Sequence, residues 1–239
     1  MALKSLAVAA ALLASASPGL AQEGSWVFGI GLRGVLTTSA KLFYSPDSPS
    51  EALRSQYEML QNIPGVALEL RARPPGSAFF LALSGEYQRK TSEKQKLVAV
   101  TTPPITLPVV DGYWMVPLEA SANVDVPLGS QEFSLTMGAG VGIYYAERVL
   151  EVAGIPAKSV DVQPAFGIHV RTSAEYKVTS QITAILELRF RNPQVSTSNQ
   201  FQTQEGTIGG EVIGFPQEEI SGRLDLDGMV VGLGVVIGL

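Results

Sequence analysis

The stretch AFFLALSGEYQRK, residues 78–90, decides the fold of this chain. Phe79, Leu83 and Tyr87 fall on one parity together with other apolar residues. The opposite parity holds small, polar and charged residues, among them Glu86. Because side chains alternate between the two faces of a strand, a period of two predicts β-structure. An apolar face opposite a small-and-charged face indicates a barrel whose outside meets lipid and whose inside is polar.

Seven further segments alternate in the same way, so the chain is predicted to be all-β, an eight-stranded antiparallel up-and-down transmembrane β-barrel. These segments lie near residues 25–36, 66–73, 113–126, 131–148, 159–171, 182–191 and 229–239. Short turns are expected at residues 74–77, 127–130 and 172–176, and long connections at 37–65, 91–112, 147–158 and 192–219. Short turns at one end and long loops at the other are typical of bacterial membrane barrels, and they place both termini at the short-turn end.

The apolar parity slips near the C-terminus. Leu224 and Leu226 are apolar at even positions, whereas Met229 and the residues after it are apolar at odd positions. One extra residue in a strand produces such a slip, which predicts a β-bulge at Asp227–Gly228.

The long connections carry signals of their own. Ser48-Pro49-Ser50-Glu51 has the form of a capping box with proline at the first helical position, so a surface helix is expected near residues 49–61. Residues 97–110 are expected to form a hairpin that extends the third and fourth strands. The connection over residues 192–219 is rich in Gln, Glu and Gly and is expected to be a mobile loop.

The composition limits the classes of protein to consider. Hydrophobic residues make up 46% of the 239 residues, yet no apolar run after the N-terminal segment is long enough for a transmembrane helix. The chain has no cysteine, which excludes a disulfide framework and a thiolate metal site. The net charge is −5, and no cluster of basic residues suited to phosphate groups is evident, so no nucleic-acid partner is expected.

The N-terminus reads as a secretory signal. A positive charge at Lys4, a short apolar core and a small-residue cleavage site ending at Ala21 occur in the required order. A buried helix of a cytosolic protein is the alternative. The prediction is a signal peptide over residues 1–21, followed by one barrel domain over residues 22–239 that begins at Gln22.

Alternation alone does not say which face points outward, because a soluble barrel would show the same period with its apolar face inside. Glycines on the polar parity, such as Gly138, Gly140 and Gly142, favour a narrow lumen, since they would weaken a solvated strand. The apolar parity carries no Lys, Arg, Asp or Glu in the middle of a predicted strand. Such a charge would cost ~2–4 kcal/mol at mid-membrane.

Large aromatic residues lie near the ends of the apolar faces. One expected girdle, at the short-turn end, consists of Trp26, Phe28, Phe79 and Phe133, and the other, at the loop end, of Tyr87, Trp114, Tyr145 and Phe190. Two aromatic girdles are typical of the two interfaces of a membrane. The membrane barrel is therefore preferred to the soluble one.

On this strand pattern and loop asymmetry, almost the whole mature chain resembles the small eight-stranded outer-membrane barrels of Gram-negative bacteria, the OmpA/OmpX-type porin-like superfamily. The resemblance implies location in the outer membrane, contact with outer-membrane lipid, help from periplasmic chaperones and the barrel-assembly machinery, a monomeric state and no cofactor. Members typically end in an aromatic residue. This chain departs from the pattern, because Leu239 ends it on the correct parity without being aromatic.

The polar parity supplies a candidate network in the lumen. Its members are Arg33, Glu69, Arg71, Glu86, Glu119, Asp161, His169, Arg171, Glu187 and Arg189. An eight-stranded barrel is just wide enough for its own side chains to fill it. Since unpaired buried charges are expensive, a plug of mutually paired charges is preferred to a narrow ion path.

His169 is the single histidine of the chain, so it is the test of a catalytic role. Barrels that act on lipid A use a histidine with a serine and a carboxylate, but no serine follows His169 by two positions. We therefore expect no enzyme, and no catalytic, cofactor or metal residues. The leading hypothesis is a structural or surface-interaction protein with long extracellular loops. The alternative is a narrow channel for small or hydrophobic solutes, and a lipid-modifying enzyme ranks third.

Overall fold

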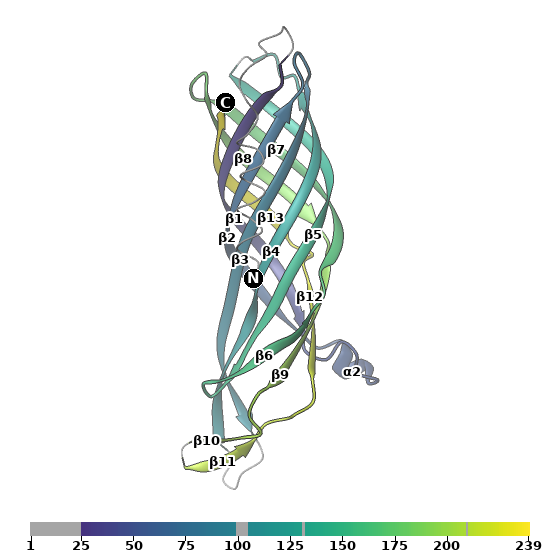
Figure 1. Ribbon diagram of the computed structural model, residues 1–239, viewed down its shortest axis with the longest axis vertical. Helices are drawn as coiled ribbons and strands as arrows, with labels where there is room; N and C mark the ends of the chain where they lie inside the picture. The colour runs from purple at the N-terminus through teal and green to yellow at the C-terminus, as the bar shows by residue number, and fades with distance from the viewer. Residues whose placement is uncertain (1–24, 99–104, 131, 209) are drawn as a thin grey trace.

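Eight antiparallel strands close into a barrel, as the alternation predicted (Figure 1). The computed structural model describes residues 25–98, 105–130, 132–208 and 210–239; the predicted signal peptide lies outside them. In order around the ring the strands are β1 (Val27–Phe43), β2 (Tyr57–Arg73), β3 (Phe79–Val98), β4 (Ile105–Val126), β5 (Phe133–Val152), β7 (Ala165–Lys177), β8 (Ile182–Arg191) and β13 (Met229–Gly238). β13 closes the ring on β1, with Leu32 opposite Val235.

The strands continue well past the ring at the loop end. β4 has 22 residues, about 70 Å at ~3.3 Å per residue, and the apolar band of such a barrel is only ~25 Å tall. Three strands join the extended ends of β1–β5, namely β6 (Ile155–Val162), β9 (Gln194–Phe201) and β12 (Ile220–Asp225). We call this part the distal tier. A hairpin of β10 (Glu205–Ile208) and β11 (Glu211–Gly214) lies at its far end (Figure 1).

The direction of the apolar side chains inverts between the ring and the distal tier. In the ring, apolar residues point outward, and Leu32 is 60% exposed. In the distal tier they point inward, and Leu42 and Leu60 are 1% and 2% exposed. The ring therefore has the surface of a membrane barrel, and the distal tier has an apolar core like that of a soluble protein.

In β1, β2 and the β12–β13 segment a local irregularity produces this inversion, whereas β4 keeps one inward parity from Leu107 to Glu119. Thr37 pairs with Ile63 and Ala40 pairs with Leu60, all four buried, so β1 and β2 change parity together without losing register. Asn62 lies in this step with φ +52°, in the left-handed region that asparagine tolerates.

The third irregularity is the predicted bulge. Thr37 pairs with Val230 but Lys41 pairs with Asp225, so β12–β13 has one more residue than β1 between these points. Gly228 lies in that step, where a Cβ would be 2.2 Å from the Ser39 carbonyl oxygen. The β-bulge expected at Asp227–Gly228 is confirmed.

The surface helix predicted near residues 49–61 is present but shorter than expected. The helix α2 (Glu51–Arg54) is a single turn that projects from the side of the molecule (Figure 1), and none of its residues is buried. A short helix without an apolar face has no packing to stabilise it. The expected capping box is absent as well, because Ser50 is the N-cap and makes no side-chain cap hydrogen bond. From Tyr57 onward the chain is already strand β2.

Three further expectations, about one turn, one strand and one long connection, are wrong. Residues 172–176 continue β7, and the turn follows Lys177, with Val178 N–H donating to Ile182. The predicted strand over residues 159–171 is interrupted at Pro164, which separates β6 from β7. Residues 192–219 are not a single loop, because they carry β9, β10 and β11. The hairpin expected at residues 97–110 is confirmed, since β3 and β4 pair as far as Val98 and Ile105.

Among the described residues, no helix has the length and apolar character needed to cross a membrane.

Candidate functional site: the charged interior of the barrel

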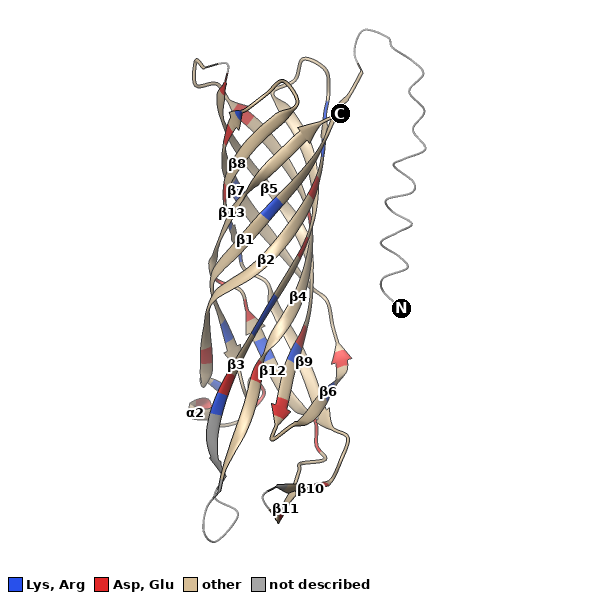
Figure 2. Cartoon of the chain, turned by 90° about the vertical axis from the view of Figure 1, so that its left-hand side faces the viewer, with Lys and Arg blue, Asp and Glu red and all other residues tan. Residues whose placement is uncertain are grey.

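The interior of the ring is lined by charged side chains from six strands, β1, β2, β3, β4, β7 and β8. Their register positions bring them together, because inward residues of neighbouring strands lie opposite one another. In Figure 2 the ring strands are tan over most of their length, and charged residues gather toward the distal tier.

One half of the network surrounds two carboxylates. Glu69 of β2 accepts ion pairs from Arg33 at 2.8 Å and Arg171 at 2.6 Å. Glu187 of β8 pairs with Arg171 at 2.7 Å and also with Arg33. All four side chains are at most 2% exposed. Two arginines and two glutamates from four strands thus form a closed set across the lumen.

The other half lies toward the distal tier. Arg191 pairs with Glu86 at 2.9 Å and with Glu119 at 3.4 Å. Arg189 pairs with Glu86 at 3.1 Å and also with Glu119 and Glu187, which connects the two halves. Tyr144 donates its hydroxyl hydrogen to Glu119 at 2.8 Å. These side chains fill the lumen where β3, β4 and β8 face one another.

The short-turn end of the network is formed by Arg71. Its guanidinium pairs with Glu69 and, at 2.8 Å, with Glu175 of β7. It also lies 4.9 Å from the ring centroid of Phe80, as does the guanidinium of Arg73. The Phe80 ring, which is 1% exposed, therefore contacts both cations at this end of the network.

The network is balanced in charge. Its ion pairs join five arginines to five glutamates, namely Arg33, Arg71, Arg171, Arg189 and Arg191 with Glu69, Glu86, Glu119, Glu175 and Glu187. A buried charge is tolerated where it is paired and hydrogen-bonded. The arrangement is a neutral plug and offers no excess charge of one sign that would attract an ion.

Three glycines of β5 provide the space for this plug. A Cβ at Gly138 would lie 2.1 Å from the Asn123 side-chain oxygen, and one at Gly140 would lie 2.0 Å from the Ala120 carbonyl oxygen. At Gly142 it would lie 2.9 Å from Glu119 Cγ. β5 is therefore the wall against which the long side chains of the other strands fit.

The structure places nine of the ten sequence-predicted lumen residues inside the ring, and it differs at Asp161. Asp161 is exposed on β6 and accepts a hydrogen bond from Gln163 at 2.8 Å. The prediction fails because β6 belongs to the distal tier, where the apolar parity is inverted, and because β6 carries a bulge between Ser159 and Asp161.

Two network members escaped the sequence analysis. Arg191 lies two residues beyond Arg189 on the same parity, so the alternation contained the signal for it. Glu175 fell in a segment that had been assigned to a turn. Once β7 extends to Lys177, Glu175 has the inward parity of Arg171 and Ser173.

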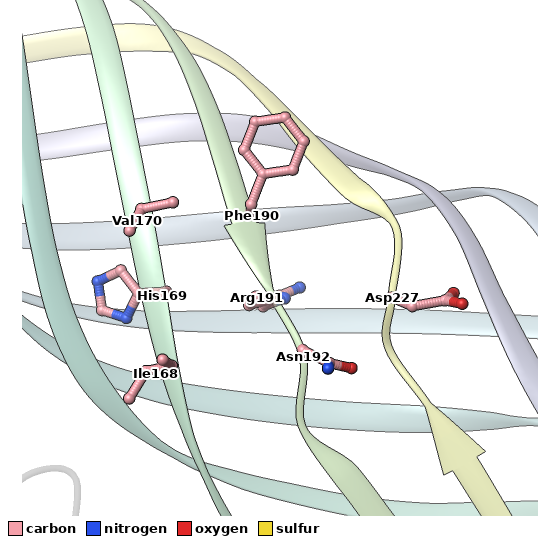
Figure 3. A pocket seen from close by; sticks show the side chains of 7 residues that line it. All are labelled: Ile168, His169, Val170, Phe190, Arg191, Asn192 and Asp227. Atoms are coloured by element: carbon pink, nitrogen blue, oxygen red, sulfur yellow. The ribbon is translucent and has the colours of Figure 1, made fainter.

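His169 is buried beside the network and is 3% exposed. Its ring points away from β8 (Figure 3) and toward β5, with Cε1 2.7 Å from the Cβ position of Gly140. Its Nδ1 makes no hydrogen bond to any described residue. The pairing of histidine with a serine and a carboxylate that activates a nucleophile is not formed among these residues. No cluster suited to a metal ion is present in the described ranges.

The predicted girdle residues lie on the outer surface at the two ends of the ring. Trp26, Phe28, Phe79 and Phe133 are 40–47% exposed at the short-turn end. At the other end Tyr145 is 39% and Phe190 52% exposed, and the Trp114 and Tyr145 rings lie 6.1 Å apart. Tyr176 and Phe166, which the sequence analysis did not include, are exposed as well.

The distal tier contains a second polar site, which the sequence analysis missed. Arg148 makes a two-pronged hydrogen bond to Asp111, at 2.8 Å and 2.6 Å, and both side chains are 4% exposed. Asn199 links β5 and β6 by donating to the carbonyl oxygens of Arg148 and Ala157, both at 3.2 Å. Nearby, the pKa of the Tyr44 hydroxyl is raised, first by burial and then by its hydrogen bond to Glu58.

No protein-family model matches the chain, and no curated protein matches it significantly. Solved structures do match. OprG, an outer membrane protein from Pseudomonas aeruginosa, is 11% identical over 91% of this chain and 97% of that chain, with a TM-score of 0.57. Neisserial surface protein A (NspA) is 15% identical over 88% and 96%, with a TM-score of 0.44. Ail of Yersinia pestis is 10% identical over 91% and 100%, with a TM-score of 0.45.

The likeness to OprG establishes the fold. The ring has the fold of an eight-stranded outer-membrane β-barrel, which confirms the fold predicted from the strand pattern. Its apolar outer face between two aromatic girdles is the surface that a lipid bilayer requires.

Proposed function

We propose that this outer-membrane barrel is a closed membrane anchor whose distal tier presents a folded β-surface to the cell exterior. The balanced plug of five arginines and five glutamates is the observation that supports this role. A lumen of eight strands has no room for a water column beside such side chains. The folded distal tier supplies an ordered surface of the kind that meets a partner outside the cell.

Conductance of the refolded protein in planar bilayers tests the closed lumen. We expect no steady discrete openings from the wild type. The double variant Arg189→Ala with Glu119→Ala keeps the charge balance while removing two side chains from the centre of the plug. It therefore serves as the control that shows whether an opened lumen would be detected. Steady openings from the wild-type protein would contradict the closed anchor.

The orientation is tested on intact cells, since the natural chain has no cysteine. A cysteine at Val212 of β11, which is 63% exposed, should react with a membrane-impermeant maleimide. A cysteine at Leu128 in the short turn, 48% exposed, should react only after the outer membrane is opened. The reverse pattern of labelling would contradict the proposed exterior position of the distal tier.

A second candidate, a route for hydrophobic solutes, is favoured by one feature of the wall. The β2–β3 ladder ends at Gly65 and Gln88, although both strands continue into the distal tier. Across the unpaired edges Lys94 and Glu58 form an ion pair. An opening here would lead from the apolar core of the distal tier to lipid without crossing the plug.

This second candidate predicts that closing the edges blocks entry. Cysteines at positions 58 and 94, joined by a short bifunctional maleimide, should abolish uptake of an apolar dye into lipid vesicles that contain the protein. A cross-link between cysteines at Leu97 and Thr106, which are already paired in β3–β4, is the control and should leave uptake unchanged. Uptake that is absent before cross-linking removes this candidate.

We propose no catalytic activity, no cofactor and no nucleic-acid partner, and a monomer in contact with outer-membrane lipid, assembled by periplasmic chaperones and the barrel-assembly machinery. The isolation of His169 Nδ1 from every described hydrogen-bond partner supports the non-enzymatic proposal. Loss of a lipid-modifying activity in His169→Ala would overturn it.

A further inference from the structure

The barrel wall contains a place where the ladder between β7 and β8 stops early. Pairing runs from Lys177–Thr183 to His169–Arg191. In the same register, Asn192 would lie opposite Ile168, and Pro193 would lie opposite Gly167. Proline has no N–H to donate, and the Pro193 carbonyl already accepts from Leu226 N–H at 3.1 Å. The ladder therefore cannot continue at this position.

The end of β7 nearer the distal tier consequently has one open edge. Its other edge pairs with β5 as far as Ala165 and Tyr144. On the side facing β8, residues 165–168 make no backbone hydrogen bond to any described residue. Because backbone groups alternate between the two edges of a strand, this edge presents N–H donors as well as carbonyl acceptors.

A groove of about 350 Å³ lies at this edge (Figure 3). Its residues are Ile168, His169, Val170, Phe190, Arg191, Asn192 and Asp227. Ile168, Val170 and Phe190 are 74%, 53% and 52% exposed on the outer face of the barrel. Asn192 and Asp227 supply exposed polar side chains, and the Asp227 carboxylate is paired with Lys41. The groove is thus apolar on one side and polar, without an excess charge, on the other.

The groove lies at the depth of the aromatic girdle at the loop end. Phe190 belongs to that girdle, and Phe166 on the same end of β7 is 76% exposed. Unpaired backbone groups are not tolerated next to lipid hydrocarbon. Whatever fills the groove must therefore supply hydrogen bonds to the β7 edge and an apolar chain to Ile168, Val170 and Phe190.

We propose that this groove binds one acyl chain of an outer-leaflet glycolipid that carries amide-linked or hydroxylated chains. An amide or hydroxyl both donates and accepts, which matches the open β7 edge, whereas the ester groups of a glycerophospholipid only accept. Asn192 provides a further donor and acceptor for the same group. The volume is at the low end of ligand sites, which span ~300–1,000 Å³, so it fits a segment of one chain and not a whole lipid.

Native mass spectrometry of the refolded protein tests the proposal. The protein is released from nanodiscs that contain equal amounts of a glycerophospholipid and an N-3-hydroxyacyl glucosamine lipid, and the lipids that remain bound are counted. Val170→Trp fills the groove. Val66→Trp is the matched control, because Val66 is 59% exposed on β2 of the same barrel. Pro193→Ala provides an N–H that can donate to the open β7 edge at Gly167. A heat-dependent gel shift verifies that each variant is folded.

We expect one hydroxyacyl lipid to remain on the wild type and on Val66→Trp, with roughly tenfold preference over the glycerophospholipid, a factor that corresponds to about 1.4 kcal/mol. Val170→Trp and Pro193→Ala should lose that preference. Equal retention of both lipids by the wild type overturns the proposal. Equal loss in Val66→Trp and Val170→Trp overturns it too, as does unchanged retention in the folded groove variants.

Discussion

Glu187 is the position where the plug can be tested most sharply. Its carboxylate accepts from Arg33, Arg171 and Arg189, and it is fully buried. Glu187→Gln keeps the shape but leaves five arginines facing four carboxylates. Removing one partner from a buried ion pair costs about 3–5 kcal/mol. Since the glutamine oxygen still accepts a hydrogen bond, we expect the lower end for Glu187→Gln and the upper end for Glu187→Ala.

The assay is urea unfolding in phospholipid vesicles, followed by the fluorescence of Trp26 and Trp114, which lie near the two membrane interfaces. Glu211→Gln is the matched control, because it makes the same change of charge at an exposed position of β11. Its free energy of unfolding should stay within about 0.5 kcal/mol of the wild type. Adding Arg171→Gln to Glu187→Gln restores the balance and should cost less than the sum of the single changes. A loss below about 1 kcal/mol for Glu187→Gln, or strict additivity in the double variant, would refute the plug as a coupled network.

Three further predictions concern packing. Gly140→Val should prevent formation of the heat-shifting barrel in gels, because its Cβ would lie 2.0 Å from the Ala120 carbonyl oxygen, whereas Gly85→Ala, with its nearest contact at 3.4 Å, should fold normally. Gly228→Ala should destabilise the β-bulge at Asp227–Gly228, because its Cβ would lie 2.2 Å from the Ser39 carbonyl oxygen. The urea midpoint of unfolding should fall, and a midpoint equal to that of the wild type would contradict this close contact. Asp111→Asn removes the carboxylate facing Arg148 and should cost about 3–5 kcal/mol locally. Limited proteolysis should then cut the distal tier while the ring persists, and uncut protein would count against this ion pair as a stabilising contact of the distal tier.

The ring was predictable because lipid on one side and charge on the other leave a strong period of two. Phe79, Leu83 and Tyr87 are outward, and Glu86 is inward, as the sequence alone implied. The slip at Asp227–Gly228 was visible for the same reason.

The distal tier was not predictable by the same route. The parity changes in β1 and β2 occur together, at a step that contains Asn62 in β2. Apolar and polar residues alternate on both sides of this step, but the apolar residues face outward on one side and inward on the other. Asp161 was misplaced by that inversion. The Asp111–Arg148 pair depends on how β4 and β5 lie side by side, which the period of one strand does not contain.

The inverted parity is also the feature that a single measurement tests most directly. Nitroxide labels can be placed one at a time on the cysteine-free chain, at Leu32 and Leu36 in the ring and at Leu42 in the distal tier, and the protein refolded in lipid vesicles. We expect oxygen, which partitions into lipid, to relax the labels at Leu32 and Leu36 strongly, and the label at Leu42 to be shielded from oxygen and from a water-soluble nickel reagent alike. Shielded labels at Leu32 and Leu36, or a label at Leu42 in contact with lipid, would contradict the account that the ring faces lipid while the distal tier folds around its own apolar core.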